Sequence, residues 1–402
     1  MKSIKYGLLP LMVSLAVSCG KEPEEKGDDT PVTLTEFLLA DYDKDGNGLL
    51  DDQEVLAIER IDCIYQGITS LEGIERLANL RYLDCRGNAL KEVDFSKNPR
   101  LEYLDCRSNM IESLDVSSNA ALESLNCSLN PLDKVEIRNH AALRTFSCRY
   151  NELDAVDLSG CTALEEIFLD ASVINELDMS GCTALTKLDF YRIQLTSLDV
   201  RGCTALTSLS CYENQLTSLN VSGCTALTIL DCYGKLTNLN VRGCTALTSL
   251  SCYENQLTSL DVSGCTALED LDCRSNQLTA LDVSGCTALV SLFCYENQLT
   301  SLDLSKNTKL EDLRCYDNEY YVTAANNRFD LSLLPGDFEA AKASDWSGGT
   351  VEGNILTFTG RETNYGQVCA SYAYQTGYTG EVEAFKTVRF TLVCDNYDES
   401  LK

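Results

Sequence analysis

One sixteen-residue segment recurs along this chain, and in its clearest copy it reads Leu206-Thr-Ser-Leu-Ser-Cys-Tyr-Glu-Asn-Gln-Leu-Thr-Ser-Leu-Asn-Val221. It returns almost unchanged at residues 247–262 and 289–304. Alignment on the first leucine places twelve copies, which begin at Leu80, Leu101, Leu122, Leu143, Leu164, Leu185, Leu206, Leu227, Leu247, Leu268, Leu289 and Leu310. The step is 21 residues, except for 20 between Leu227 and Leu247. A fixed period of this size is typical of a solenoid, in which each repeat forms one coil of a stack.

Each copy follows the pattern L-x-x-L-x-C-x-x-N-x-L-x-x-L-x-V. Apolar and polar residues alternate around Leu209 and Cys211, which predicts a short β-strand with one buried face. One repeat cannot cover its own apolar side, so stacked neighbours must cover it. The recurring asparagine is expected to satisfy backbone groups where the chain leaves the strand. Its copies are Asn88, Asn109, Asn130, Asn151, Asn214, Asn255, Asn276, Asn297 and Asn318.

This pattern resembles the leucine-rich repeat, with cysteine in place of the usual third leucine. Ile68, Leu71, Ile74 and Leu77 follow an internalin-like spacing ahead of the first full copy. The resemblance implies a repeat solenoid over residues 58–328, shaped as a horseshoe with one parallel β-strand per repeat. We expect an N-terminal EF-hand-like cap and a small C-terminal β-domain at its two ends.

The 21 cysteines fall mainly into two columns of the repeat. In the first column Leu169 and Phe190 replace cysteine, so the position is an apolar packing site, where a free thiol behaves as a small hydrophobe. Its cysteines are Cys85, Cys106, Cys127, Cys148, Cys211, Cys232, Cys252, Cys273, Cys294 and Cys315. The second column holds Cys161, Cys182, Cys203, Cys224, Cys244, Cys265 and Cys286, with Asn98, Asn119, His140 and Asn307 elsewhere. We interpret it as an inward position at a turn. Reduced structural thiols are predicted, because parallel in-register side chains fit disulfide torsions poorly; disulfides, metal ladders and catalytic cysteines are the alternatives.

Residues 1–18 read as an export signal, in which Lys2 and Lys5 precede an apolar run over residues 7–17. The run ends at Ala16-Val-Ser-Cys19, which resembles a bacterial lipobox. That resemblance implies a lipidated Cys19 at the mature N terminus, an acidic tether over residues 19–32, and lipid-anchored display at the outer membrane and cell surface. Ala16 departs from the usual leucine, so ordinary cleavage after Ser18 is the alternative.

Residues 43–54 read Asp-Lys-Asp-Gly-Asn-Gly-Leu-Leu-Asp-Asp-Gln-Glu and match the EF-hand calcium loop. The match assigns Ca²⁺ ligands to Asp43, Asp45, Asn47, Leu49 (through its carbonyl), Asp51 (through water) and Glu54. Residues 33–62 then form a helical cap on the open end of the solenoid, with Ca²⁺ in a structural role. The alternative is a solvated acidic turn without a metal.

Residues 329–402 leave the repeat pattern. Alternating β-branched and aromatic residues between glycine-rich turns predict a small β-domain, with Trp346 in its core. Cys369 and Cys394 lie outside both cysteine columns, and the sequence leaves open whether they pair.

The side chains beside the buried leucine and cysteine of each strand should point to the concave face of the horseshoe. The residue directly after the column cysteine is usually Tyr or Arg, and we call this set the Tyr/Arg column: Tyr191, Tyr212, Tyr233, Tyr253, Tyr295, Tyr316, Arg86, Arg107, Arg149 and Arg274. Tyr and Arg are enriched at binding hot spots. The column is therefore the candidate ligand site, although the copying of one template would also produce it.

The sequence does not indicate an enzyme, because it has a single histidine, His140, and no recognisable pairing of a nucleophile with a base. A net charge of −29 argues against a nucleic-acid partner, which needs basic surface. The interpretation is a surface-anchored, non-enzymatic, adhesin-like protein that holds a protein ligand. The alternatives are a glycan-capturing component of an outer-membrane uptake system and an envelope scaffold without a soluble ligand.

Overall fold

The computed structural model describes residues 32–401, apart from residues 171–173, 176, 178, 180, 337, 361–362, 365–366, 381, 383 and 385. The predicted signal, Cys19 and nearly all of the acidic tether lie outside the described residues. Within the described part of the chain, every helix is too short or too polar to cross a lipid bilayer.

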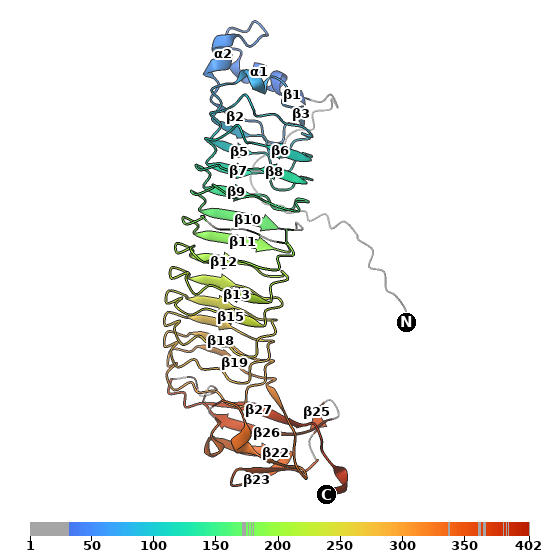
Figure 1. Ribbon diagram of the computed structural model, residues 1–402, viewed down its shortest axis with the longest axis vertical. Coiled ribbons are helices and arrows are strands. Elements are labelled where there is room, and N and C mark those ends of the chain that lie inside the picture. Colours follow the sequence, from blue (N-terminus) through green and yellow to red (C-terminus); the bar gives the residue numbers. More distant parts are fainter. Residues whose placement is uncertain are drawn as a thin grey trace, which may run out of the picture. The chain divides into compact units, whose positions relative to one another are not determined.

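A parallel sheet of 13 strands runs through the described residues, with one strand per coil (Figure 1). Each strand pairs in register with the next coil, so that Leu209 lies beside Leu230. The strands are β2 (Arg60–Asp62), β4 (Tyr82–Asp84), β5 (Tyr103–Asp105), β7 (Ser124–Asn126), β9 (Thr145–Ser147), β10 (Glu166–Asp170), β11 (Lys187–Tyr191), β12 (Ser208–Ser210), β14 (Ile229–Asp231), β16 (Ser249–Ser251), β17 (Asp270–Asp272), β18 (Ser291–Phe293) and β19 (Asp312–Arg314). The predicted solenoid with one parallel strand per repeat is confirmed.

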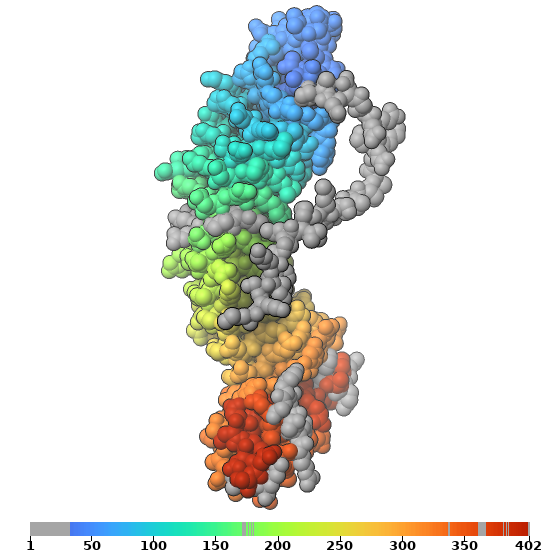
Figure 2. Space-filling model, turned by 90° about the vertical axis from the view of Figure 1, so that its right-hand side faces the viewer, coloured from blue at the N-terminus to red at the C-terminus, as the bar shows by residue number. Residues whose placement is uncertain are grey.

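The core lies behind this sheet, where the repeated leucines and both cysteine columns are buried. Short strands on the other side of the coils pair in two places, β6 (Ser113–Asp115) with β8 (Lys134–Glu136) and β13 (Ser218–Asn220) with β15 (Asn238–Asn240). Cysteines of the first column are buried thiols. In Figure 2 the colours follow one another along the long axis in sequence order, so the core is one continuous stack of neighbouring coils.

The asparagine ladder ties each coil to the one before it. Asn109 Nδ2 donates to the carbonyls of Cys85 at 3.1 Å and Cys106 at 2.9 Å, while its Oδ1 accepts from Leu90 N at 3.1 Å. Asn276 repeats the arrangement further along the stack. The predicted backbone-satisfying role of this asparagine is confirmed.

The second cysteine column makes a similar link at the turns. Asn119 Nδ2 donates to the carbonyls of Phe95 and Asn98, at 3.0 and 2.8 Å. Where cysteine takes the position, its thiol donates to the matching carbonyl, as in the 3.1 Å contact from Cys161 Sγ to Ile137 O. The inward polar position that the sequence predicts is therefore present, and a thiol can fill it because it offers one weak donor.

Two kinds of irregular repeat change the structure only near the irregular residues. Ile193 replaces a ladder asparagine and is buried, and β10 and β11 there extend to five residues each. The other replacement, Ser172, lies outside the described residues. The repeat that lacks one residue makes its turn at Gly234 with φ of +155°, and β14 keeps its register with both neighbours.

The N-terminal cap comprises β1 (Val32–Thr33), α1 (Leu34–Tyr42), α2 (Asp52–Ala57), β3 (Ile68–Ser70) and η1 (Ile74–Arg76). The sequence predicts an entering helix over residues 35–42, which agrees with α1. It predicts an exiting helix over residues 54–61, whereas α2 ends at Ala57. The helix stops early because Ile58 is buried as the first apolar residue of the repeat pattern, and the chain then enters β2.

The expected C-terminal β-domain is present as two small sheets. One contains β20 (Glu319–Val322), β27 (Thr387–Cys394), β26 (Gln367–Gln375), β22 (Ala343–Ser347) and β25 (Thr363–Asn364). The other contains β21 (Arg328–Asp330), β24 (Ile355–Phe358) and β23 (Gly349–Glu352), and the short helices are η2 (Leu331–Leu333), η3 (Ala340–Lys342) and η5 (Glu399–Leu401). β20 lies before residue 329, yet it pairs with β27 near the end of the chain.

Buried tyrosines join this domain to the last repeats. Tyr372 Oη donates to Thr300 O at 2.6 Å, and Tyr378 Oη donates to Leu310 O at 2.9 Å. Trp346 stacks on Tyr372 with ring centroids 4.4 Å apart, in agreement with its predicted place in the core. Cys369 lies opposite Val393 on the neighbouring strand, and Val393 directly precedes Cys394. Because successive residues of a strand point to opposite faces of the sheet, the side chains of Cys369 and Cys394 lie on opposite faces and form no disulfide with each other.

Candidate binding face and calcium loop

The outer face of the 13-stranded sheet carries the residues that the sequence assigns to the ligand. We use "outer face" for the side away from the leucine core. On β4, Leu83 is buried while Tyr82 is partly exposed, as is Arg86 just after the strand. Some carboxylates on this face are covered, however, because Asp84 and Asp105 are only 2% exposed.

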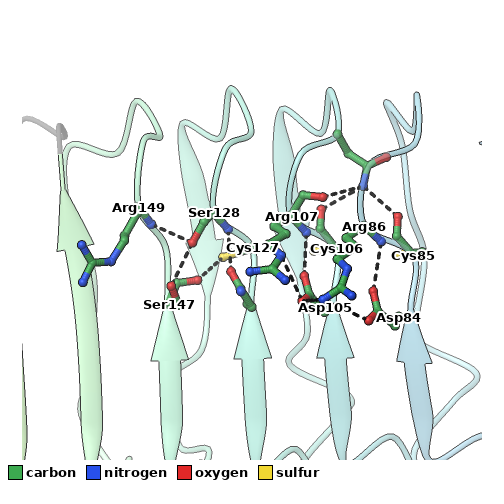
Figure 3. A network of polar contacts seen from close by, with 12 residues as sticks. Asp84, Cys85, Arg86, Asp105, Cys106, Arg107, Cys127, Ser128, Ser147 and Arg149 are labelled. Atoms are coloured by element: carbon green, nitrogen blue, oxygen red, sulfur yellow. Dashed lines mark hydrogen bonds and ion pairs between the residues drawn. The ribbon is translucent and has the colours of Figure 1, made fainter. Parts of the chain in front are cut away.

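Arginines of the Tyr/Arg column lie over these carboxylates (Figure 3). Arg86 Nη1 is 3.6 Å from Asp84, and Arg107 Nε is 3.3 Å from Asp105. Burial raises the pKa of Asp105 even with these cations nearby. The first two arginines are thus held above acidic groups, with their side chains still about a third exposed.

Arg149 has shorter ion pairs than Arg86 and Arg107, and its side chain points toward the following coils. Its Nη1 and Nη2 each lie 2.6 Å from a carboxylate, that of Asp170 and that of Asp189. The guanidinium also lies 5.0 Å from the centroid of the Phe168 ring. In Figure 3 Arg149 points away from Arg107, and Ser128 and Ser147 lie between them.

The tyrosines of the column form a stack that the sequence analysis missed. Ring centroids are 5.1 Å apart between Tyr191 and Tyr212, 4.7 Å between Tyr212 and Tyr233, and 4.6 Å between Tyr233 and Tyr253. The stack could have been predicted from the repeated tyrosines, because in-register parallel strands lie ~4.8 Å apart, which is also a ring-stacking distance. We call these four residues the Tyr stack.

Arg274 and the remaining two tyrosines continue the series. The Arg274 guanidinium lies 4.4 Å from the Tyr253 ring and 5.7 Å from the Tyr295 ring, and Tyr295 stacks on Tyr316 at 4.5 Å. The predicted residues from Tyr191 to Tyr316 are therefore brought together in one line. Arg86 and Arg107 lie in the same column but five and four coils from Tyr191.

The hydroxyls of the Tyr stack stay protonated at neutral pH. A hydrogen bond with Tyr150 raises the pKa of Tyr191 to about 12. Tyr233 Oη donates to Glu213 at 2.9 Å, and burial together with this contact raises the pKa of Tyr233. The stack thus presents neutral hydroxyls and ring edges, while neighbouring rings cover the faces of its central members.

The predicted calcium loop, residues 43–54, brings three of its expected ligands together. Carboxylate oxygens of Asp43, Asp45 and Glu54 all lie within 4.8 Å of one another. Backbone N–H groups, above all that of Gly48, lower the pKa of Asp43, and Gly48 makes the sharp turn with φ of +78°. Hard oxygen donors that converge in this way fit Ca²⁺.

The other predicted ligands have local roles in the loop. Asn47 Oδ1 accepts from Leu49 N at 2.8 Å. Asp51 lies outside the carboxylate cluster and caps α2, with Oδ1 accepting from Gln53 N at 2.7 Å and Glu54 N at 2.9 Å. The cap also positions Glu54, whose Oε2 accepts from Asp51 N.

The loop is fastened to the first coils. Arg76 Nη2 donates to Leu50 O at 2.9 Å, and Asn79 Nδ2 donates to Leu56 O at 2.8 Å. Tyr42 Oη donates to Arg60 O at 2.6 Å, next to the start of the sheet. These contacts link the loop and its two helices to the first coils of the solenoid.

The single histidine and the column cysteines are buried in packing positions. His140 is buried, with Nδ1 2.8 Å from Ile137 O and Nε2 2.9 Å from Val116 O. Burial raises the pKa of the Cys85 and Cys106 thiols well above the ordinary value, which suppresses the reactive thiolate.

Comparison with known proteins finds the same repeat pattern and fold elsewhere. A family model described as leucine-rich repeats in two copies matches residues 245–285. The functional domain of InlJ from Listeria monocytogenes, described as including a cysteine ladder, is 25% identical with a TM-score of 0.57, over 85% of this chain and 91% of InlJ. The chain therefore has the leucine-rich repeat fold and is similar to InlJ.

Two further solved structures share this fold. An internalin, InlF, from Listeria monocytogenes is 22% identical with a TM-score of 0.54, over 72% of this chain and 82% of its own. A leucine-rich repeat protein of Leptospira interrogans is 21% identical with a TM-score of 0.54, over 68% of this chain and 81% of its own. No curated protein matches the sequence.

Proposed function

We propose that this chain is a non-enzymatic, adhesin-like binding protein that holds a protein ligand on the outer face of its sheet. The Tyr stack carries this proposal. Its rings are already ordered by one another, so binding does not have to immobilise them, and pre-ordering favours affinity. Tyrosine edges, hydroxyls and arginine are also the groups most common at protein hot spots.

The same geometry speaks against the Tyr stack as a glycan platform. A sugar ring stacks on an open aromatic face, whereas Tyr212 and Tyr233 have neighbours on both faces. What remains accessible is a row of ring edges with neutral hydroxyls. Such a row suits a protein surface with mixed apolar and polar groups.

The experiment compares binding of residues 32–402, a compact unit of the chain, on arrays of purified proteins and of glycans. The test variant replaces Tyr212, Tyr233 and Tyr253 with alanine. Its matched control replaces Ser218, Asn238 and Ser259 with alanine, which are exposed residues in the same three repeats.

We expect a protein ligand whose binding falls at least tenfold in the tyrosine variant and persists in the control. Binding to glycans alone would contradict the proposal. Protein binding that survives the loss of all three tyrosines would move the site away from the Tyr stack.

We also propose that the chain is anchored at the cell surface through lipidated Cys19, after removal of residues 1–18, with residues 19–32 as the tether. The support is the lipobox-like sequence and the acidic stretch that follows it. Radiolabelled palmitate should enter the wild-type protein and not the Cys19→Ala variant. External protease should degrade the protein on intact cells, and protection from it would contradict outward display.

Ca²⁺ is the proposed ligand of the loop over residues 43–54, in a structural role. Asp43, Asp45 and Glu54 supply converging carboxylates, and the contacts from Arg76 and Asn79 link the loop to the first coils. The bound ion would offset the repulsion among these carboxylates and so stabilise the cap.

A further inference from the structure

The outer face has a hollow of about 430 Å³ over β7 and β9. It exists because these two strands carry small polar side chains where their neighbours carry large ones. Its floor includes Ser124, Asn126 and Ser147, and its walls are Tyr103, Arg107, Leu129, Arg149, Tyr150 and Phe168. We call it the β7–β9 hollow.

Tyr103 presents an aromatic ring to this hollow. Its ring stacks on Tyr82 with centroids 4.3 Å apart and planes 4° apart, and the Arg60 guanidinium lies 3.5 Å from the Tyr82 centroid. On the opposite side the next strand in register supplies Ser124, which is too small to cover the ring. The series Arg60–Tyr82–Tyr103 therefore ends at an open face, unlike the central rings of the Tyr stack.

The rim of the hollow is unusually apolar for a solvent-exposed surface. Leu129 is 50% exposed and Tyr150 is 48% exposed. Both occupy the turn directly after the Tyr/Arg column, with φ of +56° and +55°. The corresponding turn positions further along include Glu213, Glu254 and Glu296. Apolar turn residues thus mark the edge of the hollow.

Positive charge lies on both sides of the hollow, in a chain with a net charge of −29. Among the described residues, the guanidinium of Arg107 pairs with a single carboxylate, that of Asp105, and its side chain is 39% exposed and so accessible to a partner. Arg149 on the other side is saturated by two carboxylates. A partner that carries an acidic group beside an aromatic ring complements this arrangement.

We propose that the β7–β9 hollow is the anchor pocket for the protein ligand. It takes an aromatic side chain that stacks on Tyr103, and an adjacent carboxylate of the partner pairs with Arg107. This inference rests on the proposed function and names the chemistry of the partner. Aromatic side chains fit better than sugars here because Leu129 and Tyr150 give the rim a mainly carbon surface.

The probe is a random linear peptide library displayed on phage and selected on residues 32–402. We expect selected peptides to share a Tyr, Trp or Phe next to Asp or Glu. Ser124→Trp fills the hollow with a ring of its own and should weaken a selected synthetic peptide at least tenfold. Arg107→Gln should weaken it several-fold and reduce the salt dependence of binding.

Ser249→Trp is the matched control, because Ser249 occupies the same repeat position on β16 and is not among the residues that line the β7–β9 hollow. It should leave affinity within twofold of wild type. Circular dichroism melts test whether each variant folds. Ser147→Phe provides a second way to fill the hollow if Ser124→Trp is unstable.

Two outcomes would overturn the inference in distinguishable ways. Peptides that bind Ser124→Trp and Ser147→Phe normally, but lose binding when Tyr212, Tyr233 and Tyr253 are removed, would leave the proposed function standing and refute the anchor pocket. Binding of an arrayed glycan that Ser124→Trp abolishes, without any selected peptide, would refute both.

Discussion

The ring of Tyr65 lies over Gly87, where a Cβ atom would stand 2.1 Å from Tyr65 Cε1. Gly87 also has φ of +70°, which disfavours any side chain. We expect Gly87→Ala to lower the free energy of unfolding by about 1–2 kcal/mol, because the ring must move and the backbone becomes strained. Urea unfolding followed by circular dichroism measures the loss.

Ser108→Ala is the control for this substitution. Ser108 occupies the same turn one coil later and has φ of +56° with a side chain already present. It should change stability by less than about 0.5 kcal/mol. Equal effects at the two positions would show that Tyr65 does not constrain Gly87.

His140 is expected to act as a structural bridge. Both ring nitrogens lie within 2.9 Å of carbonyl oxygens, and Asn119 makes an equivalent link one coil earlier. His140→Asn should be nearly neutral. His140→Leu should cost about 2 kcal/mol or more, because a buried carbonyl loses the ring N–H that donates to it. Urea denaturation compares them, and a stable leucine variant would contradict the bridging role.

We expect the half-buried carboxylate of Asp231 to lower stability at neutral pH. Burial raises its pKa, and among the described residues its Oδ1 has no hydrogen-bond partner. The folded state therefore binds the proton more tightly than the unfolded state. Stability falls as pH rises through the folded pKa, and the cost is complete at neutral pH. Asp231→Asn should raise the melting temperature at pH 7, with a gain that shrinks toward pH ~4.

Asp272→Asn is the matched comparison on β17. Burial raises the pKa of Asp272 too, but Arg274 Nε lies 3.5 Å from its carboxylate. Removal of this charge also removes an ion pair, so the gain should be smaller. If Asp231→Asn is less stable than wild type across this pH range, the hydrogen bonds that the carboxylate accepts from Ser251 and from Tyr233 N–H outweigh the cost of its burial.

Calcium should stabilise the N-terminal cap. For a site with a dissociation constant of roughly 10⁻⁴ M, a hundredfold excess of Ca²⁺ adds about 2.7 kcal/mol to the folded state. Thermal unfolding and limited proteolysis of residues 33–100 should both respond to Ca²⁺ and to chelator. Glu54→Gln should abolish the response, whereas Asp41→Asn, outside the carboxylate cluster, should retain it. A wild-type protein indifferent to chelation would contradict a structural Ca²⁺ site.

The thiols of the solenoid should be unreactive in the folded protein. Burial raises the pKa of Cys203 and Cys265 to about 11 and that of Cys244 to about 12. At pH 8 iodoacetamide should modify these residues only as fast as the protein unfolds, which mass spectrometry across a urea series measures. Rapid modification with an intact circular dichroism spectrum would contradict the buried thiol columns.

The repeat period predicts most of the solenoid because each residue position has one environment in every coil. Leu209 and Asn109 could be placed in the core and in the ladder for that reason. The hollow beside Tyr103 could not, because it depends on small residues in the following two coils. The pairing of β20 with β27 joins segments about 70 residues apart, and no periodicity relates them.

The calcium loop shows the same division between local pattern and tertiary structure. Loop spacing brings Asp43, Asp45 and Glu54 together as the sequence predicts. The early end of α2 is set by Ile58, which packs into the first coil instead of continuing the helix. The length of α2 is therefore set by a tertiary contact of Ile58, which the local helical pattern does not predict.

The turn at Gly234 lets a shortened coil keep both of its neighbours in register. Coils are therefore interchangeable building units, and gene duplication or deletion can add or remove them without repacking the interior. Each whole coil changes the reach of the molecule by ~4.8 Å. Natural variants of this chain should thus differ in length by complete coils and present the same two ends at different separations.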